Sequence, residues 1–284
     1  MSPTRRIPSR LTKPVRDYSV MAARIARAAF VRADRSTFDG VRCYCLFIGY
    51  PRSGHSLVGS IVGAHADAVI SHELDALRYV QTGLVGRDLL YSMILRRDRE
   101  FSDSGRTWTG YEYSVPGQAH GRFDELLVIG DKRGGGSTKR LRAHPELLDR
   151  LERLVEVDLR MVHVIRDPFD TITSMHRRGG TLQANVDRFF GLCATNAAIK
   201  ARRPDAVIDV RLEALVEHPV EVVRRLVGFL GLEASHGYLD SCAAIVFEAP
   251  KRTRDTIEWP PRLITEVEHR LTEFEFLQGY AFDR

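Results

Sequence analysis

From residue 43 onward, short runs of apolar residues alternate with longer stretches in which apolar residues recur every three or four positions. The short runs have the length of buried strands, and the longer stretches have the periodicity of helices. This alternation is typical of parallel βαβ units and predicts a doubly wound, three-layer α/β domain whose parallel sheet has about five strands. The expected strands are Cys43–Gly49, Ala68–Ser71, Leu126–Gly130, Arg160–Ile165 and Ala206–Val210.

The helical stretches fall between and after these strands. The expected helices cover about Gly54–His65, Leu74–Arg99, Arg140–Leu154, Phe169–Arg177, Leu182–Ala201, Val220–Leu230 (closed by Gly231) and Pro260 to near Phe276. The segment Phe101–Arg122 is polar, rich in Gly and Ser, and contains Trp108, Tyr111 and Tyr113. It is too long for a simple connection, so we expect a loop or lid there. In this architecture ligands bind at the carboxyl ends of the strands.

Charge divides the chain into two parts. The chain has 284 residues and a net charge of +5, but residues 1–40 hold nine Arg or Lys against three acids, so this arm carries +6 and the remainder −1. We therefore separate a basic N-terminal arm (1–40) from a domain at 41–284. Residues 15–31 can form a short helix with arginines on one side, and Arg24 and Arg27 interrupt any secretory signal. We expect a solvated arm, with contact to a membrane surface or an anionic partner as the alternative.

The remaining composition is that of an ordinary globular domain, with 44% hydrophobic and 28% charged residues. No run approaches the ~20 uncharged apolar residues of a transmembrane helix. Cys43, Cys45, Cys193 and Cys242 form no CxxC pair and have no His partner at zinc spacing. We therefore expect reduced packing thiols, no metal and a cytoplasmic location.

The segment between the first expected strand and the first expected helix carries the most information. It reads Ile48-Gly49-Tyr50-Pro51-Arg52-Ser53-Gly54-His55-Ser56-Leu57. Backbone N–H groups and a helix N-terminus can bind an anion at such a junction. Gly49 and Gly54 have P-loop spacing and Ser56 ends the motif, but His55 stands where a P-loop has its lysine. The cation is instead Arg52, inside the loop. This loop suits an anionic group other than Mg–ATP, because a kinase without that lysine loses its main cation for the transferring phosphate.

This loop resembles the 5′-phosphosulfate loop of sulfotransferases that use 3′-phosphoadenosine 5′-phosphosulfate (PAPS), whose pattern is close to Pro-Lys/Arg-Ser-Gly-Thr-Thr. The segment Val164–Ser174 resembles the family's 3′-phosphate segment, with Arg166 after a strand and Ser174 eight residues later. Residues 210–219 and 229–232 resemble a further stretch that reads roughly Tyr-Glu-Asp-Leu…Pro…Phe-Leu-Gly. The matches span about residues 44–260 in the family's order, and the resemblance implies a P-loop-like fold and a sulfotransferase activity.

Four positions depart from the family's common residues. His55 and Ser56 replace the usual pair of hydroxyl residues, and Leu212 replaces a Tyr that is often found there. Arg52 replaces the Lys of the cytosolic branch, as is usual in the bacterial and carbohydrate-like branches. The departures bear on individual contacts to the nucleotide rather than on the family resemblance.

The resemblance also implies roles for individual residues. Arg52 would stabilise the leaving phosphate oxygen with backbone amides of the loop, and Lys132 would hold sulfuryl oxygens. Glu73 is the expected general base, as in the glutamate branches, and His72 is its rival. The expected donor-binding residues are Arg52, Ser53, Gly54, His55, Ser56, Arg166, Ser174, Arg252 and Arg254. His163, His176 and His269 are expected to be structural or at the surface.

The sequence therefore favours transfer of a sulfuryl group from PAPS, without a metal, to a hydroxyl or amine. Residues 74–122 would form the acceptor pocket, and their aromatic residues suit a small molecule, a lipid or a carbohydrate alike. We expect no nucleic-acid partner, and the oligomeric state stays open. One alternative is a P-loop kinase with Asp131 or Asp167 near a metal. The other is an adenine-nucleotide-binding protein that keeps Arg166 and Ser174 but has no catalytic activity.

Overall fold

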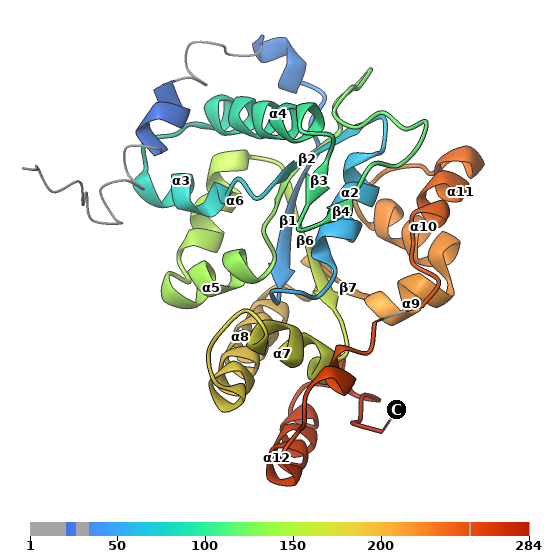
Figure 1. The fold of residues 1–284 in the computed structure, drawn as a ribbon. Coiled ribbons are helices and arrows are strands. Elements are labelled where there is room, and N and C mark those ends of the chain that lie inside the picture. Colours follow the sequence, from blue (N-terminus) through green and yellow to red (C-terminus); the bar gives the residue numbers. More distant parts are fainter. Residues whose placement is uncertain (1–20, 27–33, 250, 284) are drawn as a thin grey trace, which may run out of the picture.

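The computed structural model describes residues 21–26, 34–249 and 251–283 (Figure 1). Most of the basic N-terminal arm therefore lies outside the described residues, as does most of the helix expected at 15–31. Of that expected helix, residues 21–26 are helical, and Met21 is buried in the core. In these three ranges no helix has the length and apolar character needed to cross a membrane.

A parallel five-stranded sheet forms the centre of the domain, as predicted. Its strands are β1 (Cys43–Gly49), β2 (Ala68–His72), β5 (Val128–Lys132), β6 (Asp158–Ile165) and β7 (Val207–Arg211). Their order is β2-β5-β1-β6-β7, so β1 is the central strand. All seven residues of β1 are buried, as expected for a strand covered on both faces. Parallel strands place all their carboxyl ends at one edge of the sheet.

Helices cover both faces of the sheet (Figure 1). The first hydrophobic cluster joins Tyr44 and Leu46 of β1 to α3 (Ala76–Thr82), α4 (Arg87–Asp103), α5 (Gly135–Ala143) and α6 (Leu147–Val155). The second joins Cys45 and Phe47 to α2 (His55–Gly63), α9 (Leu212–Glu217), α10 (Pro219–Phe229) and α11 (His236–Ala244). Alternate residues of β1 thus face opposite layers. This three-layer arrangement confirms the predicted fold class.

A third cluster extends the core beyond the carboxyl end of β6. It contains α7 (Pro168–His176), α8 (Leu182–Arg202), α12 (Pro261–Leu271) and the 3-10 turn η4 (Glu275–Leu277). Two further 3-10 turns are η2 (Pro204–Ala206) and η3 (Thr253–Thr256), and η1 (Arg35–Phe38) precedes β1. The four cysteines are unpaired and buried, as expected of packing thiols.

Two expected helices are each divided in two. The stretch 74–99 forms α3 and α4 because Gly83 takes a left-handed φ of 71° after α3. The stretch 140–154 forms α5 and α6 because Pro145 disfavours helical geometry at His144, whose ψ is 75°. In α10, the prediction that Gly231 closes the helix is correct: its φ is 83°, and Leu232 N donates to Val227 O over 2.9 Å.

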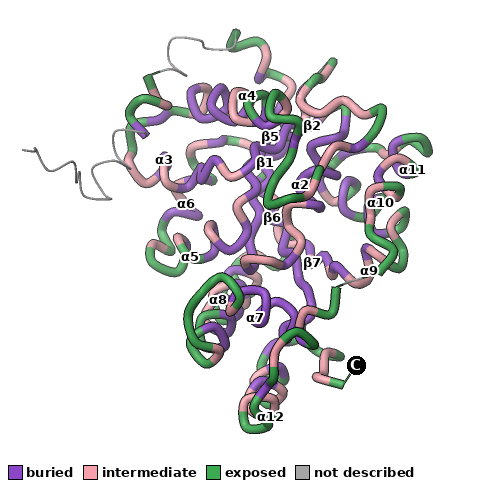
Figure 2. The backbone as a smooth tube through the Cα atoms, in the orientation of Figure 1, coloured by how far each residue is buried: buried purple, intermediate pink, exposed green. Residues whose placement is uncertain are grey.

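The expected lid contains a short antiparallel hairpin, β3 (Thr107–Trp108) and β4 (Tyr111–Glu112). Its base is fixed by Arg106, whose Nη1 lies 3.1 Å from Asp98 Oδ1 of α4, and both side chains are buried. Figure 2 shows that the hairpin itself is largely exposed. The hairpin is thus anchored firmly at its start while its tip projects over the carboxyl edge of the sheet (Figure 1).

Candidate active site

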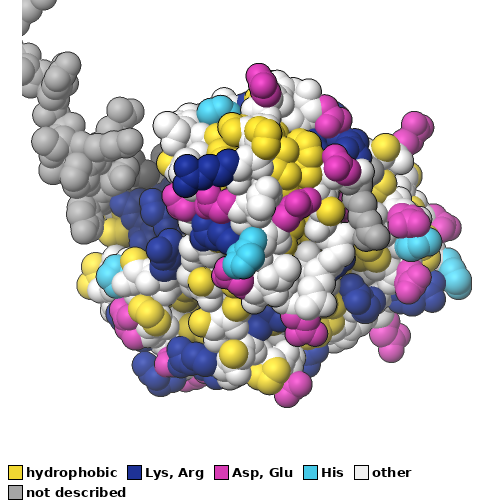
Figure 3. All heavy atoms as spheres, turned by 90° about the horizontal axis from the view of Figure 1, so that it is seen from below, with side chains coloured by type: hydrophobic (Ala, Val, Ile, Leu, Met, Phe, Trp, Pro, Cys, Tyr) yellow, Lys and Arg dark blue, Asp and Glu magenta, His cyan; other side chains and the backbone are white. Residues whose placement is uncertain are grey.

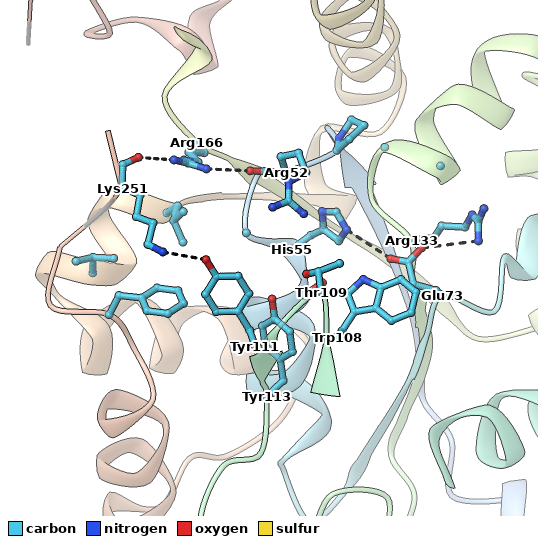
Figure 4. A pocket seen from close by; sticks show the side chains of 18 of the residues that line it. Arg52, His55, Glu73, Trp108, Thr109, Tyr111, Tyr113, Arg133, Arg166 and Lys251 are labelled. Carbon is cyan, nitrogen blue, oxygen red and sulfur yellow. Dashed lines mark hydrogen bonds and ion pairs between the residues drawn. The ribbon is translucent and has the colours of Figure 1, made fainter. Parts of the chain in front are cut away.

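A cavity of about 350 Å³ lies at the carboxyl ends of the strands, where the architecture predicts a ligand site. Its walls come from the loop after β1, the ends of β2, β5 and β6, the hairpin β3–β4 and α9, together with Phe247, Ala249 and Lys251. Figure 3 looks toward this edge of the sheet, and Lys and Arg side chains border hydrophobic ones on this face. Figure 4 shows Arg52, His55, Glu73 and the hairpin aromatics converging on the cavity.

The loop between β1 and α2 has the geometry of an anion-binding turn. Arg52 takes a φ of 70° and Gly54 a φ of 90°, so the chain makes two left-handed steps before α2 begins at His55. Ser53 is fully buried and its Oγ donates to Tyr50 O over 3.0 Å. The φ of Gly54 favours glycine, and a Cβ there would also lie 2.9 Å from Leu212 Cδ1. The first backbone N–H groups of α2 therefore open toward the cavity.

Arg52 and Ser174, which are far apart in the sequence, meet beside this loop. Arg52 Nε donates to Ser174 Oγ over 3.1 Å. Burial and the nearby Arg178 lower the pKa of Arg52, and Arg166 acts in the same direction. Such a concentration of positive charge is unfavourable unless an anion binds close by.

Arg166 lies at the end of β6 and lines the same cavity. Its guanidinium donates to Arg52 O over 3.3 Å, to Thr253 Oγ1 over 3.2 Å and to Lys251 O (Figure 4). Its Nε is buried and has no hydrogen-bond partner. An unpaired buried donor costs about 1–3 kcal/mol, so a ligand oxygen that accepted from it would stabilise this arrangement. Arg52, Ser174 and Arg166 thus lie together as one cluster of hydrogen-bonding side chains.

Glu73 and Lys132 form an ion pair on the opposite side of the cavity. Lys132 Nζ lies 2.9 Å from Glu73 Oε1 and 3.0 Å from Ser56 Oγ of the loop. Lys132 is 1% exposed, whereas Glu73 lines the cavity. Glu73 has a φ of 57°, so the chain turns sharply as β2 ends. Lys132 therefore connects the carboxylate to the anion-binding loop.

The pKa values of both members of this pair are shifted downward, and the shift at Glu73 keeps that carboxylate ionised. Burial raises the pKa of Glu73, but the contact with His55 and the charge of Lys132 outweigh burial, and the net shift is downward. Burial lowers the pKa of Lys132, and Glu73 opposes that effect. A carboxylate beside a cation remains charged, since the pair is more stable than either neutral partner.

His72 lies next to Glu73 in sequence but faces a different environment. Its ring stacks on Phe101 at 3.9 Å between centroids and meets Trp108 edge-on at 5.0 Å. Its Nε2 lies 3.4 Å from Lys132 Nζ. Burial and the charge of Lys132 lower the pKa of His72 to about 2, so the ring is neutral. His72 is 3% exposed and does not line the cavity.

The two arginines expected from the basic loop lie outside the cavity lining. Arg254 is 3% exposed and is ion-paired with Asp167 and Asp170 of the α7 region. Arg252 forms an ion pair with Asp255 over 3.3 Å. The residue of this loop that lines the cavity is Lys251, whose Nζ lies 3.0 Å from Tyr111 OH. The 3-10 turn η3 carries Arg254 into the protein, whereas Lys251 precedes this turn and lines the cavity.

Several cavity residues were not assigned from the sequence. Arg133 Nη1 lies 3.7 Å from Glu73 Oε2, and Gly135 and Gly136 follow at the start of α5. The run Lys132–Gly136 after a strand was the available signal, since glycines at a helix N-terminus permit close approach of a ligand. Tyr113 and Trp108 were noted only as aromatic residues of a lid.

Asp131 and Asp167, the two carboxylates that the kinase alternative places near a metal, make their contacts within the fold. Asp131 accepts hydrogen bonds from Ser71 Oγ, Leu74 N and Ala76 N, and it is 1% exposed. Asp167 caps α7 and pairs with Arg254. Across the part of the chain that the structure describes, no group of three or more His, Cys, Asp or Glu residues could hold a metal ion.

Comparison with known proteins shows what the fold and the sequence are similar to. No curated protein sequence matches the chain. The sulfotransferase domain from the curacin biosynthetic pathway superposes with a TM-score of 0.52 at 15% identity, over 82% of this chain and 98% of that domain. Sulfotransferase STF9 from Mycobacterium avium has a TM-score of 0.50 at 11% identity, over 93% of this chain and 86% of that one. Both share the fold. The model of the sulfotransferase family matches residues 46–236, more than half of the sequence, and the chain therefore belongs to the sulfotransferase family.

Proposed function

We propose that the protein transfers a sulfuryl group from PAPS to a hydroxyl or amine of an acceptor molecule. The observation that carries the proposal is one cavity with a cationic cluster at one end and an ionised carboxylate at the other. Arg52 and Arg166 belong to the cluster, and Glu73 is the carboxylate. Family membership supports the reaction class.

The cationic end suits the two anionic groups of PAPS. Ser174 Oγ and the unpaired Arg166 Nε supply a hydroxyl and a buried guanidinium donor for the 3′-phosphate. The N–H groups of Gly54, His55 and Ser56 at the start of α2 suit the 5′-phosphosulfate. Lys251 lies beside this cluster and adds a cation. Arg252 and Arg254 contribute to the shape of the loop rather than to contacts with the donor.

In the proposed reaction an acceptor oxygen or nitrogen bonds to sulfur while the bond from sulfur to the 5′-phosphate oxygen breaks. Negative charge then develops on the leaving phosphate, and Arg52 is the cation inside the loop that can neutralise it. Lys132 contacts both Ser56 and Glu73, so it lies between the sulfuryl position and the acceptor position. Preorganised charge of this kind removes the need for the site to rearrange during the reaction.

The acceptor must lose a proton, and Glu73 is the proposed base. It lines the cavity and stays ionised, because its pKa lies below the usual range. His72 is a weaker candidate because it is buried outside the cavity lining and its Nε2 faces the Lys132 ammonium. A base must reach the proton that it removes before its pKa matters.

A transfer assay with labelled PAPS tests the function. The protein is incubated with a panel of phenols, aliphatic alcohols, sugars and amines, and sulfated products are identified by mass spectrometry. We expect label in at least one class of product. PAPS binding without transfer to any acceptor or to components of a cell extract would favour the non-catalytic binder, and phosphate transfer from ATP would favour the kinase.

A further inference from the structure

The turn that follows β2 carries Glu73, and its backbone has an unfavourable conformation. Glu73 has a φ of 57° and Asp75 a φ of 67°, so two non-glycine residues within three positions are left-handed. Residues with a Cβ keep this conformation only where surrounding contacts hold them in it. The position of the proposed base therefore depends on the groups that bind this turn.

The buried carboxylate of Asp131 accepts hydrogen bonds from the backbone of this turn. Its Oδ1 accepts from Leu74 N over 3.1 Å and from Ser71 Oγ over 2.8 Å, and its Oδ2 accepts from Ala76 N over 2.8 Å. Leu74 N belongs to the peptide bond that follows Glu73, so its hydrogen bond restricts the ψ of the proposed base. Each oxygen of the carboxylate thus faces a backbone N–H group of the turn.

The side chain of Asp75 does not supply these contacts, although Asp75 is the N-cap residue of α3. Its two oxygens accept from Arg140 of α5 over 3.0 and 2.6 Å. Arg133 lies on the cavity side of the turn, 3.6 Å from Asp75 Oδ2 and 3.7 Å from Glu73 Oε2 (Figure 4). The three consecutive residues 131–133 at the end of β5 therefore all hold this turn. Of their side chains, only the Asp131 carboxylate can accept from backbone N–H groups.

We propose that Asp131 is a positioning residue that acts through Glu73: as a carboxylate it holds the turn so that Glu73 faces the acceptor, and its protonation loosens the turn. The inference rests on the proposed function. In a protonated carboxyl group, one oxygen becomes a hydrogen-bond donor. A proton on Oδ2 would face Ala76 N–H, and a proton on Oδ1 would face Leu74 N–H and the Ser71 hydroxyl. In either case the hydrogen bond to one backbone N–H group of the turn is lost or weakened.

The titratable and charged groups around Asp131 come from β1, β5, α5 and the turn itself. They are Tyr44, Cys45, Lys132, Glu73, Asp75 and, behind Asp75, Arg140. Burial raises the pKa of Asp131 to about 6; hydrogen bonds from Ala76 N and Ser71 oppose this shift, and the charges of Asp75 and Glu73 add to it. Asp131 therefore changes charge at a pH where Glu73, whose pKa lies below its usual range, is still ionised.

The turn can be tested without an acceptor. In ¹⁵N-labelled protein, with and without 3′-phosphoadenosine 5′-phosphate (PAP), the backbone amide signals of Leu74 and Ala76 should titrate together with an apparent pKa of about 6. The titration should be absent in Asp131→Asn, whose side chain carries no titratable proton. Amide signals that do not titrate, or that titrate alike in both proteins, would overturn the inference and leave the proposed transferase intact.

Activity supplies the second test, at saturating PAPS and acceptor. Asp131→Asn keeps the shape of the side chain but only one acceptor oxygen, so the base is less well positioned and kcat above neutral pH should fall about tenfold, with PAP affinity unchanged. The kcat of the wild type should decrease toward that of the variant as the pH drops through about 6. A kcat ratio that is the same at every pH would show that Asp131 has only a structural role.

Asp167→Asn is the matched control for the loss of a buried carboxylate. Burial also raises the pKa of Asp167 to about 6, but Asp167 is ion-paired with Arg254, away from the turn that carries Glu73. The acid-side decrease of kcat at saturating PAPS should therefore persist in Asp167→Asn. Its disappearance in this variant, with retention in Asp131→Asn, would assign the decrease to Asp167 and contradict the inference.

Ser71→Ala tests the same inference if Asp131→Asn does not fold. The variant removes a hydrogen bond that lowers the pKa of Asp131, so the acid-side decrease of kcat should move to higher pH. A decrease at the wild-type pH would be the opposing result.

Thermal unfolding separates positioning from loss of structure. The pKa of Asp131 is raised above its ordinary value, so the folded state takes up the proton more readily than the unfolded chain. The wild type should therefore gain stability relative to Asp131→Asn between about pH 7 and about pH 5, while its kcat decreases. A relative loss of wild-type stability over this range would attribute the decrease in kcat to unfolding instead.

Discussion

Lys132 Nζ lies 2.9 Å from Glu73 Oε1, and this buried contact joins two strands that are adjacent in the sheet but about sixty residues apart in the sequence. The same ammonium lies 3.0 Å from Ser56 Oγ of the donor loop. Removing one partner of a buried ion pair leaves an uncompensated charge. We therefore expect substitutions in this pair to change both the protonation of Glu73 and the turnover of the protein.

Lys132→Met should raise the pKa of Glu73, because the variant removes a cation that stabilises the carboxylate. The measurement is ¹³C NMR of the glutamate carboxyl carbons over a pH titration, with Glu73→Gln to assign the signal. In the wild type, Glu73 should titrate below the ordinary glutamate range. Equal titration of Glu73 in both proteins would show that Lys132 does not control its charge.

Glu73→Gln should lower kcat strongly, by about 10²-fold or more, and leave PAP affinity nearly unchanged, since a base acts on chemistry more than on donor binding. His72→Ala should be the milder change in kcat, although it removes a ring that packs on Phe101. Both variants are assayed with one acceptor over a range of pH, and PAP binding reports whether each is folded. An active Glu73→Gln beside an inactive, PAP-binding His72→Ala would transfer the base assignment to His72.

Arg52→Ala should reduce turnover by about 10²-fold, the scale for removal of one preorganised charge stabiliser. Arg52→Lys should recover part of the loss, because a point charge can still face the leaving oxygen, although it cannot keep the guanidinium contact with Ser174. Steady-state kinetics of the three proteins provide the measurement. Normal turnover of Arg52→Ala would show that Arg52 does not stabilise the leaving phosphate.

PAP should bind markedly more tightly than AMP, because Arg166 and Ser174 are assigned to the 3′-phosphate, and each charge-assisted hydrogen bond contributes about 1.5–3 kcal/mol. Isothermal titration calorimetry of wild type, Arg166→Ala and Ser174→Ala measures the difference. Both variants should lose selectivity for PAP and keep their weak affinity for AMP. Arg252→Ala, in an exposed ion pair with Asp255, is the matched control and should keep the selectivity. Equal affinity of the wild type for the two nucleotides would refute the assignment.

EDTA should leave activity unchanged. Asp131 and Asp167 make their hydrogen bonds and ion pairs within the fold, so neither is free to hold Mg²⁺ beside the phosphate loop. Initial rates with EDTA and with added Mg²⁺ are compared at fixed PAPS. An absolute Mg²⁺ requirement would favour the kinase alternative.

The sequence by itself determined the features that depend on neighbouring residues. Apolar runs located all five strands of the sheet to within two residues at every end, since strands buried on both faces are largely apolar. The loop 48–57 was recognisable because its glycines and its arginine lie within a few positions of one another. The two divided helices were harder to predict, because Gly83 and Pro145 end helices only where the packing allows a turn.

Tertiary structure decided which side chains meet. The order β2-β5-β1 brings Lys132 against both Glu73 and Ser56, and strand pairing over such distances leaves no local pattern in the sequence. The turn η3 directs Arg254 into the protein and leaves Lys251 at the cavity. The position of His55 opposite Glu73 likewise depends on how the end of β2 turns, at a residue with a φ of 57°. Side-chain direction at the end of a strand is set by the backbone turn, and only the folded chain determines that turn.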